Sequence, residues 1–144
     1  MGTFESLEQA REYFKNDRYA MTSGMHLDEL YEDGSCLCSM TLTDQHKNAL
    51  GGVMGGVIYT LADFAFAVAC NQRHRPTVAL EVNMHYLSMP RGEHLYARAA
   101  CLKDGRNTCL YQVRLTDDTG REVALFVGTG FKLDPEQKKQ EHAK

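Results

Sequence analysis

In the middle of the chain, residues 48–71 read NALGGVMGGVIYTLADFAFAVACN. Two glycine pairs open this stretch, and from residue 57 to residue 69 every side chain is apolar or small except Tyr59, Thr60 and Asp63. A helix that is apolar on nearly all sides belongs in the interior of a protein, and these thirteen residues are too few to cross a bilayer. The stretch therefore predicts a glycine-rich entry into a buried helix, around which the rest of the chain is organised.

Asp63 is the first candidate functional residue. It is the only formal charge between Lys47 and Arg73, and an ionised carboxylate on a buried helix costs free energy unless it is paired, hydrogen-bonded or protonated. The helix alone leaves two interpretations open: a structural carboxylate bonded to a neighbouring loop, and a functional acid. Apolar surroundings should raise the pKa of Asp63.

The same stretch resembles the core motif of the hotdog-fold acyl-CoA thioesterases of the phenylacetate-degradation (PaaI-type) family. In that motif an Asn is followed, after a short spacer, by His-Gly-Gly and by an acid eight residues after the first glycine. Asn48, Gly55, Gly56 and Asp63 fall in register with it, whereas Met54 stands where the family usually has His. The similarity in chain order extends from about residue 44 to residue 132.

The resemblance implies hydrolysis of an aryl- or medium-chain acyl-CoA to a free acid and CoA. It assigns the role of nucleophile or general base to Asp63, the oxyanion contact to the Gly55 amide, and the orientation of water or substrate to Asn48. Main-chain N–H groups at a helix N-terminus lack intrahelical partners, and glycines let a carbonyl approach them closely. The candidate substrate contacts are Gly56, Met54, Arg91 and Arg106, with the two arginines as partners of the CoA phosphates.

The substitution at position 54 keeps a second class of function open. Without the imidazole, the chain is also compatible with a non-catalytic or regulatory hotdog module that binds acyl-CoA. In either case coenzyme A enters as part of the substrate or ligand, and no separate cofactor is expected. A hotdog dehydratase would need a His poised beside the acid, and the sequence places none on the central helix.

Composition sets the broad class. The 144 residues, 43% hydrophobic and 24% charged, fit one globular domain. A net charge of -3 gives no basic field for nucleic acid, so no nucleic-acid partner is expected. Because the apolar stretch is too short to cross a bilayer, no membrane partner is expected either. The five cysteines are odd in number and no signal peptide precedes them, which indicates a reducing cytoplasm.

The flanking segments predict one helix and six strands. A capping-box pattern at Ser6 opens a short amphipathic helix that ends near Asn16. A loop through Ser23 then leads to strands at 25–31 and 36–43. On the second strand alternate positions share a face, which favours core cysteines over metal ligands; these positions are Cys36, Cys38, Met40 and Leu42.

After the central helix, Pro76 makes helix continuation unfavourable, and four strands with alternating apolar residues follow at about 78–86, 95–101, 109–115 and 123–131. Gly128 and Gly130 in the last strand indicate close backbone packing. The strand at 78–86 is predicted to place Val78, Leu80, Val82, Met84 and Tyr86 on one apolar face. The last strand's apolar face is predicted to consist of Val123, Leu125, Val127, Thr129 and Phe131. The pattern predicts an α+β fold, an antiparallel sheet wrapped around one helix, and the resemblance names it a hotdog fold. The domain should span residues 1–133, with a polar tail at 134–144.

The spacing of the two main site residues predicts a shared active site. Gly55 and Asp63 are eight residues apart, or about 12 Å along a helix axis, which is too far for both to act on one carbonyl. Two helices running antiparallel across a two-fold axis would bring Gly55 of each chain towards Asp63 of the other. The resemblance implies the same arrangement, in a homodimer or a homotetramer.

Overall fold

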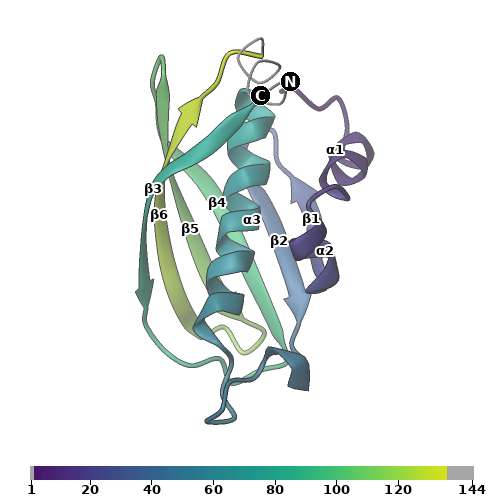
Figure 1. The fold of residues 1–144 in the computed structure, drawn as a ribbon, viewed down its shortest axis with the longest axis vertical. Helices are drawn as coiled ribbons and strands as arrows, with labels where there is room; N and C mark the ends of the chain where they lie inside the picture. The colour runs from purple at the N-terminus through teal and green to yellow at the C-terminus, as the bar shows by residue number, and fades with distance from the viewer. Residues whose placement is uncertain (1, 136–144) are drawn as a thin grey trace, which may run out of the picture.

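The computed structural model describes residues 2–135, in which one long helix lies against a curved antiparallel sheet (Figure 1). The six strands follow the order β1-β2-β4-β5-β6-β3. They are β1 (Met25–Leu30), β2 (Cys36–Thr41), β3 (Thr77–Tyr86), β4 (His94–Asp104), β5 (Thr108–Asp117) and β6 (Glu122–Lys132). The helices are α1 (Leu7–Phe14), α2 (Arg18–Thr22), the short 3-10 helix η1 (Asp44–His46) and α3 (Gly55–Arg73). This is the α+β hotdog arrangement that the sequence predicts.

Helix α3 forms the centre of the core. It packs against strands β2 to β6, and its apolar side chains are buried on most sides, as expected for a helix with so few polar residues. The helix ends at Arg73, two residues beyond the 48–71 stretch from which the sequence predicts it. Asn71 explains the difference, because its buried side-chain amide donates to the carbonyls of Ala67 (2.8 Å) and Thr77 (3.2 Å) and so joins the last helical turn to β3.

The N-terminal segment covers the β1 side of the molecule (Figure 1). Helix α1 begins as predicted, with the Ser6 hydroxyl accepting from the Gln9 amide at 3.1 Å. The expectation of a plain loop before β1 is wrong, since residues Arg18–Thr22 form α2. At five residues this helix is too short to show a clear helical period, and it is held by burial of Ala20.

Two predicted strand faces are corrected by the structure. On β3 a bulge between Ala79 and Glu81 shifts the register, so that Val78 is exposed while Val82 packs against the core. On β6 the buried face consists of Ala124, Phe126, Gly128 and Gly130, and the predicted face from Leu125 to Phe131 lies outside.

Gly128 and Gly130 explain why the inner face of β6 differs from the predicted one. A Cβ added to Gly130 would lie 2.7 Å from the Cys109 Sγ and 3.4 Å from the Phe66 ring, and one added to Gly128 would lie 3.3 Å from the same ring. The strand therefore turns its glycines inwards so that Phe66 of α3 can lie against its backbone. The predicted close backbone packing is confirmed, although it reverses the predicted face.

The cysteines on β2 are core residues, as predicted. Cys36 and Cys38 are fully buried and free, and the Cys36 thiol lies 3.2 Å from the Ala65 carbonyl of α3. The tail predicted at 134–144 lies, from residue 136 onwards, outside the described residues. Within residues 2–135 no helix is both long and apolar enough to cross a membrane.

Candidate active site

The start of α3 presents free main-chain donors. Met54 is the N-cap, in an extended conformation (φ -62°, ψ 133°), and its side chain makes no capping hydrogen bond. Within residues 2–135 neither the Gly55 nor the Gly56 amide donates a hydrogen bond to another group. A helix start without a side-chain cap leaves such N–H groups available to an anion or a polarised carbonyl.

Space around the two glycines differs. A Cβ on Gly55 would lie 3.3 Å from the ring and hydroxyl of Tyr86, whereas one on Gly56 would meet nothing within 4 Å. Gly55 thus permits the close approach of a neighbouring strand, while the Gly56 side of the helix start is open. Met54 is 55% exposed, so the residue in place of the family's His faces solvent beside the free amides.

Asn48 holds the loop that leads into α3. Its side-chain Oδ1 accepts hydrogen bonds from the main-chain amides of Leu50 (3.0 Å) and Gly52 (3.1 Å). Its main-chain N–H donates to the Gly52 carbonyl at 2.7 Å. The side-chain oxygen is therefore committed to the loop. Among the described residues the Nδ2 group has no acceptor, so it is the part of Asn48 that remains free for water or substrate.

His46 is a loop-positioning residue that sequence reasoning did not single out. Its Nδ1 accepts from the Thr43 amide at 3.0 Å, and its Nε2 lies 3.1 Å from the Ser23 carbonyl, to which it can donate. Its carbonyl accepts from the Met54 amide at 2.9 Å. The only indication in the sequence was its place two residues before Asn48, which does not distinguish it from a solvated histidine.

Asp63 is partly buried, two turns along α3 from the free amides. Burial raises the pKa of its carboxyl group, and the nearby charge of Asp17 raises it further. Within the described residues the carboxylate makes no hydrogen bond or ion pair. The structural interpretation, a carboxylate bonded to a neighbouring loop, therefore finds no support, and Asp63 is left with an unpaired acid group on the same helix as the amides.

Two tyrosines lie between these groups. Gly55, Tyr59 and Asp63 are spaced at i, i+4 and i+8 and so follow one face of α3. Burial raises the pKa of Tyr59, with further contributions from Asp63 and Tyr86. Tyr86, the last residue of β3, donates from its hydroxyl to the Gly55 carbonyl at 2.9 Å. The helical spacing could have revealed Tyr59, but only the position of β3 brings Tyr86 to the site.

The two candidate arginines lie at opposite ends of the domain. Arg91 follows β3 in the loop that packs on the Gly52 turn through Met89, so it lies at the end where α3 begins. Arg106 lies in the β4–β5 loop, whose neighbour Asn107 accepts from the Lys132 amide at 2.8 Å, at the end where α3 finishes. Both side chains are exposed. Of the two candidate arginines, Arg91 is therefore the one at the end of the domain where α3 begins.

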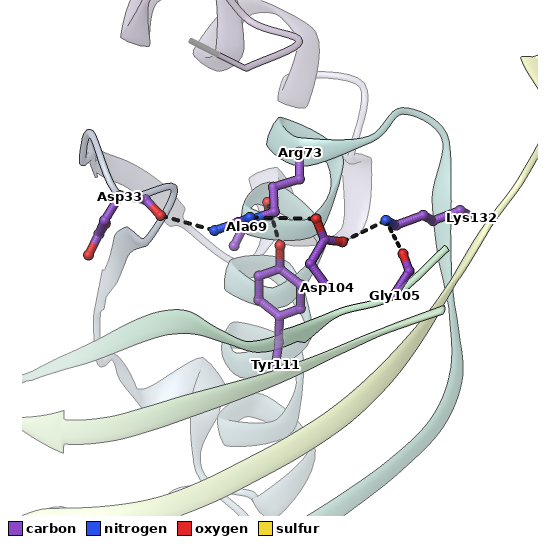
Figure 2. Close-up of polar contacts among 7 residues, drawn as sticks. All are labelled: Asp33, Ala69, Arg73, Asp104, Gly105, Tyr111 and Lys132. Carbon is purple, nitrogen blue, oxygen red and sulfur yellow. Dashed lines mark hydrogen bonds and ion pairs between the residues drawn. The ribbon is translucent and has the colours of Figure 1, made fainter. Parts of the chain in front are cut away.

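A separate cluster of charged residues lies at the C-terminal end of α3 (Figure 2). Arg73 lies 3.5 Å from the Asp104 carboxylate and donates to the Asp33 carbonyl at 3.3 Å, while Lys132 bonds the other Asp104 oxygen at 2.6 Å. The hydrogen bond from Lys132, together with the charges of Lys132 and Arg73, lowers the pKa of Asp104 despite partial burial.

A cavity of about 710 Å³ opens beside this cluster and not beside Gly55. Its lining includes four acidic residues and Arg73, which is already paired with one of them. A polyanion such as coenzyme A would meet net negative charge there. The acidic residues of its lining are Glu5, Glu32, Asp33 and Asp104. The cavity is therefore separate from the candidate catalytic groups at the start of α3.

An antiparallel sheet wrapped around one buried helix, with free glycine amides at the helix start and an unpaired acid two turns later, defines a protein of the hotdog thioesterase class. Residues 50–124 match the family model described as the thioesterase superfamily. The chain belongs to that superfamily and is a thioester hydrolase.

Comparisons with individual proteins agree. The chain is 29% identical to acyl-coenzyme A thioesterase PaaI of Escherichia coli, over 88% of this chain and 90% of that protein. It is 34% identical to human acyl-coenzyme A thioesterase 13, over 63% of this chain and 68% of that protein. The solved structure of the E. coli PaaI protein superposes with a TM-score of 0.81 at 28% identity, covering 87% of this chain and 91% of that one.

Proposed function

We propose that the protein hydrolyses the thioester of an aryl- or medium-chain acyl-CoA, releasing the free acid and CoA. The proposal rests mainly on one observation. The N–H groups of Gly55 and Gly56 have no hydrogen-bond acceptor among the described residues, and they lie on the same helix as the Asp63 carboxylate, which has no partner there either. Two similar proteins, from E. coli and human, are named acyl-coenzyme A thioesterases, which supports the substrate class.

The amides would stabilise the oxygen of the thioester as negative charge develops on it. Asp63 would act either as a base that takes a proton from water, or as a nucleophile that attacks the carbonyl carbon itself. In the first route hydroxide adds to the carbon, the C–S bond breaks, and the CoA thiolate leaves and is protonated. In the second route the Asp63 carboxylate adds to the carbon, the C–S bond breaks, and the CoA thiolate leaves and is protonated. The acyl-enzyme anhydride that remains is then hydrolysed by water to free acid and regenerated Asp63.

We further propose that each active site combines two subunits. The amides and the carboxylate are about 12 Å apart along α3, so one carbonyl cannot reach both within a chain. Strand β3 is an edge of the sheet and carries exposed apolar side chains, including Leu80 at 64% exposed. An unpaired apolar edge of this kind supports association with a second copy.

Release of free thiol from a panel of acyl-CoAs, aryl and linear, tests the function and its acyl preference. Asp63→Ala should lower kcat by about 10³-fold or more, while circular dichroism shows an unchanged fold. Wild-type turnover retained in this variant would contradict the role of Asp63. Exchange of the exposed Asp44, which pairs with Lys47 on the preceding loop, for Asn should leave the activity unchanged and serves as the control.

The second candidate is a module that binds acyl-CoA without efficient chemistry. Met54, exposed beside the free amides and without a hydrogen-bond donor in its side chain, favours this alternative. Isothermal titration with the same panel distinguishes the two: tight binding without thiol release supports the binding module, and release with turnover supports the enzyme.

A further inference from the structure

We propose that Tyr86 is a positioning residue for the oxyanion site, and that it acts by orienting and polarising the Gly55–Gly56 peptide so that the Gly56 amide becomes a second donor beside that of Gly55. This inference rests on the proposed thioesterase function. It starts from the hydrogen bond that the Tyr86 hydroxyl donates to the Gly55 carbonyl at 2.9 Å.

The Gly55 carbonyl and the Gly56 N–H belong to one planar peptide unit. A hydrogen bond to the oxygen fixes the direction of the N–H and, because hydrogen bonds in a chain polarise one another, makes that N–H a stronger donor. The Gly56 amide has no acceptor among the described residues, and the space beside Gly56 is open. The hydroxyl of Tyr86 is thus coupled, through one peptide, to a donor that faces unoccupied space.

The place of Tyr86 in the sheet supports this contact, although its side chain is 54% exposed. Tyr86 pairs with Ala124 of β6 at the end of β3, which directs its ring onto Gly55. A Cβ on Gly55 would come within 3.3 Å of the ring, so the phenol would have to shift by a few tenths of an ångström. The glycine at position 55 therefore favours the close approach of Tyr86 as well as that of a substrate.

Thr60 provides a matched comparison within the same helical turn. Its hydroxyl donates to the Gly56 carbonyl at 2.7 Å, one peptide further along. The N–H of that peptide belongs to Val57 and already donates to the Met54 carbonyl at 3.0 Å. Both hydroxyls bond a carbonyl in the first turn of α3, but only Tyr86 acts on a peptide whose N–H is free.

The first experiment compares Tyr86→Phe with Thr60→Val by steady-state kinetics. Removing one direct oxyanion donor costs about 10²- to 10³-fold in kcat, so loss of an indirect contact should cost about tenfold, with KM changed by less than about twofold. Thr60→Val should leave kcat within about twofold of the wild type. Circular dichroism and the mass of the assembly should be unchanged in both variants. Equal kcat values in the two variants would overturn the inference.

The second experiment separates polarisation from packing. Fluorinated tyrosines placed at position 86 keep the ring and make the phenol a progressively stronger donor, and kcat should rise along the series while the phenol stays protonated. A flat series in a folded enzyme would overturn the inference even if Tyr86→Phe is slow, because the ring alone would then explain the defect. A wild-type protein that binds acyl-CoA but releases no thiol would instead contradict the proposed function.

Discussion

At the residue scale, the site is a line of groups along one face of α3. Gly55, Tyr59 and Asp63 follow each other at four-residue spacing, and Tyr86 reaches the same face from β3. The two ends of the line have opposite character: the helix start offers free N–H donors, and Asp63 offers a carboxyl group whose pKa is raised by burial and by Asp17. This separation into a donor end and an acid end is what makes a second subunit necessary in the proposed mechanism.

The raised pKa of Asp63 predicts the acid limb of the pH profile. A base or nucleophile must be ionised, and a raised pKa means that ionisation is complete only above the ordinary carboxyl range. The value of kcat/KM should therefore fall as the pH drops through the raised pKa. Asp17→Asn removes the neighbouring like charge, so the limb should move to lower pH. The profile of the Asp44→Asn control should coincide with that of the wild type.

At the element scale, β6 accommodates α3 by turning its glycines inwards. Phe66 packs against Tyr111 and Phe126, with ring centroids 5.8 and 5.6 Å away, and lies over the backbone at Gly128 and Gly130. Leu125, Val127 and Phe131 lie on the outer face of the strand as a consequence. The position of the helix, and with it the position of Asp63, depends on this close contact.

Gly130→Ala should therefore destabilise the fold. The added Cβ would approach the Cys109 Sγ, the Thr77 methyl group and the Phe66 ring, none of which can move freely in the core. Overpacking of this kind costs about 1–3 kcal/mol, which urea unfolding would detect. Thr129→Ala, at the adjacent position on the outer face, should change the free energy of unfolding by less than about 0.5 kcal/mol. Equal effects in the two variants would contradict the packing argument.

A set of hydrogen bonds to Asp117 joins the loop before β4 to the β5–β6 turn. The buried Asp117 carboxylate accepts from the amides of Arg91 (2.8 Å), Gly92 (3.2 Å) and Arg121 (3.0 Å), and from the amide and hydroxyl of Thr119. Burial by itself would raise the pKa of Asp117, but these hydrogen bonds lower it well below its usual range. The loop that carries Arg91 is thus fixed by a carboxylate and not by the arginine's own side chain.

The sign of this shift predicts the response to acid. A carboxyl whose pKa is depressed in the folded state stabilises the fold above its unfolded pKa, and the contribution is lost as the pH falls below about 5. Asp117→Asn should lower the free energy of unfolding at pH 7 by about 2 kcal/mol and flatten its decline with falling pH. Asp118→Asn, an exposed neighbour, should have the smaller effect. Urea titrations at several pH values would measure both, and a parallel decline in wild type and Asp117→Asn would contradict the prediction.

At the scale of the whole molecule, one chain holds only half of each proposed site: the free amides lie at the start of α3, and Asp63 lies two turns further along it. The exposed edge strand β3 lies next to the helix start through Tyr86, so association along that edge would bring the donor end of one chain near the other chain. A two-fold axis would then generate two equivalent sites.

Mixing two inactive variants tests this arrangement. Asp63→Ala removes the acid, and Gly55→Pro removes the main-chain donor at position 55. Neither homodimer should turn over acyl-CoA, whereas co-refolded heterodimers should recover one site in two. Size-exclusion chromatography with mass measurement would verify that each variant assembles. Full activity of a verified wild-type monomer in dilute solution would refute the shared site.

The sequence by itself determined the fold class and the central helix, and it supplied the candidate site residues. These features are local: the apolar run of α3 and the glycine pair before it are visible at helical spacing, and Asn48, Gly55 and Asp63 stand at fixed intervals along one stretch. Alternation likewise located all six strands to within a few residues. Each of these features follows from residues that lie close to one another in the sequence.

Only the tertiary structure decided which faces turn inwards and which distant residues reach the site. The bulge in β3 and the contact of Phe66 with the β6 glycines depend on neighbours far away in sequence, so alternation alone assigned the wrong face to β6. Tyr86 meets Gly55 thirty-one residues away in the chain, through the pairing of β3 with β6. The physical reason is that a strand's period specifies two faces but not which one meets the helix, and that choice is made by the shape of the helix packed against it.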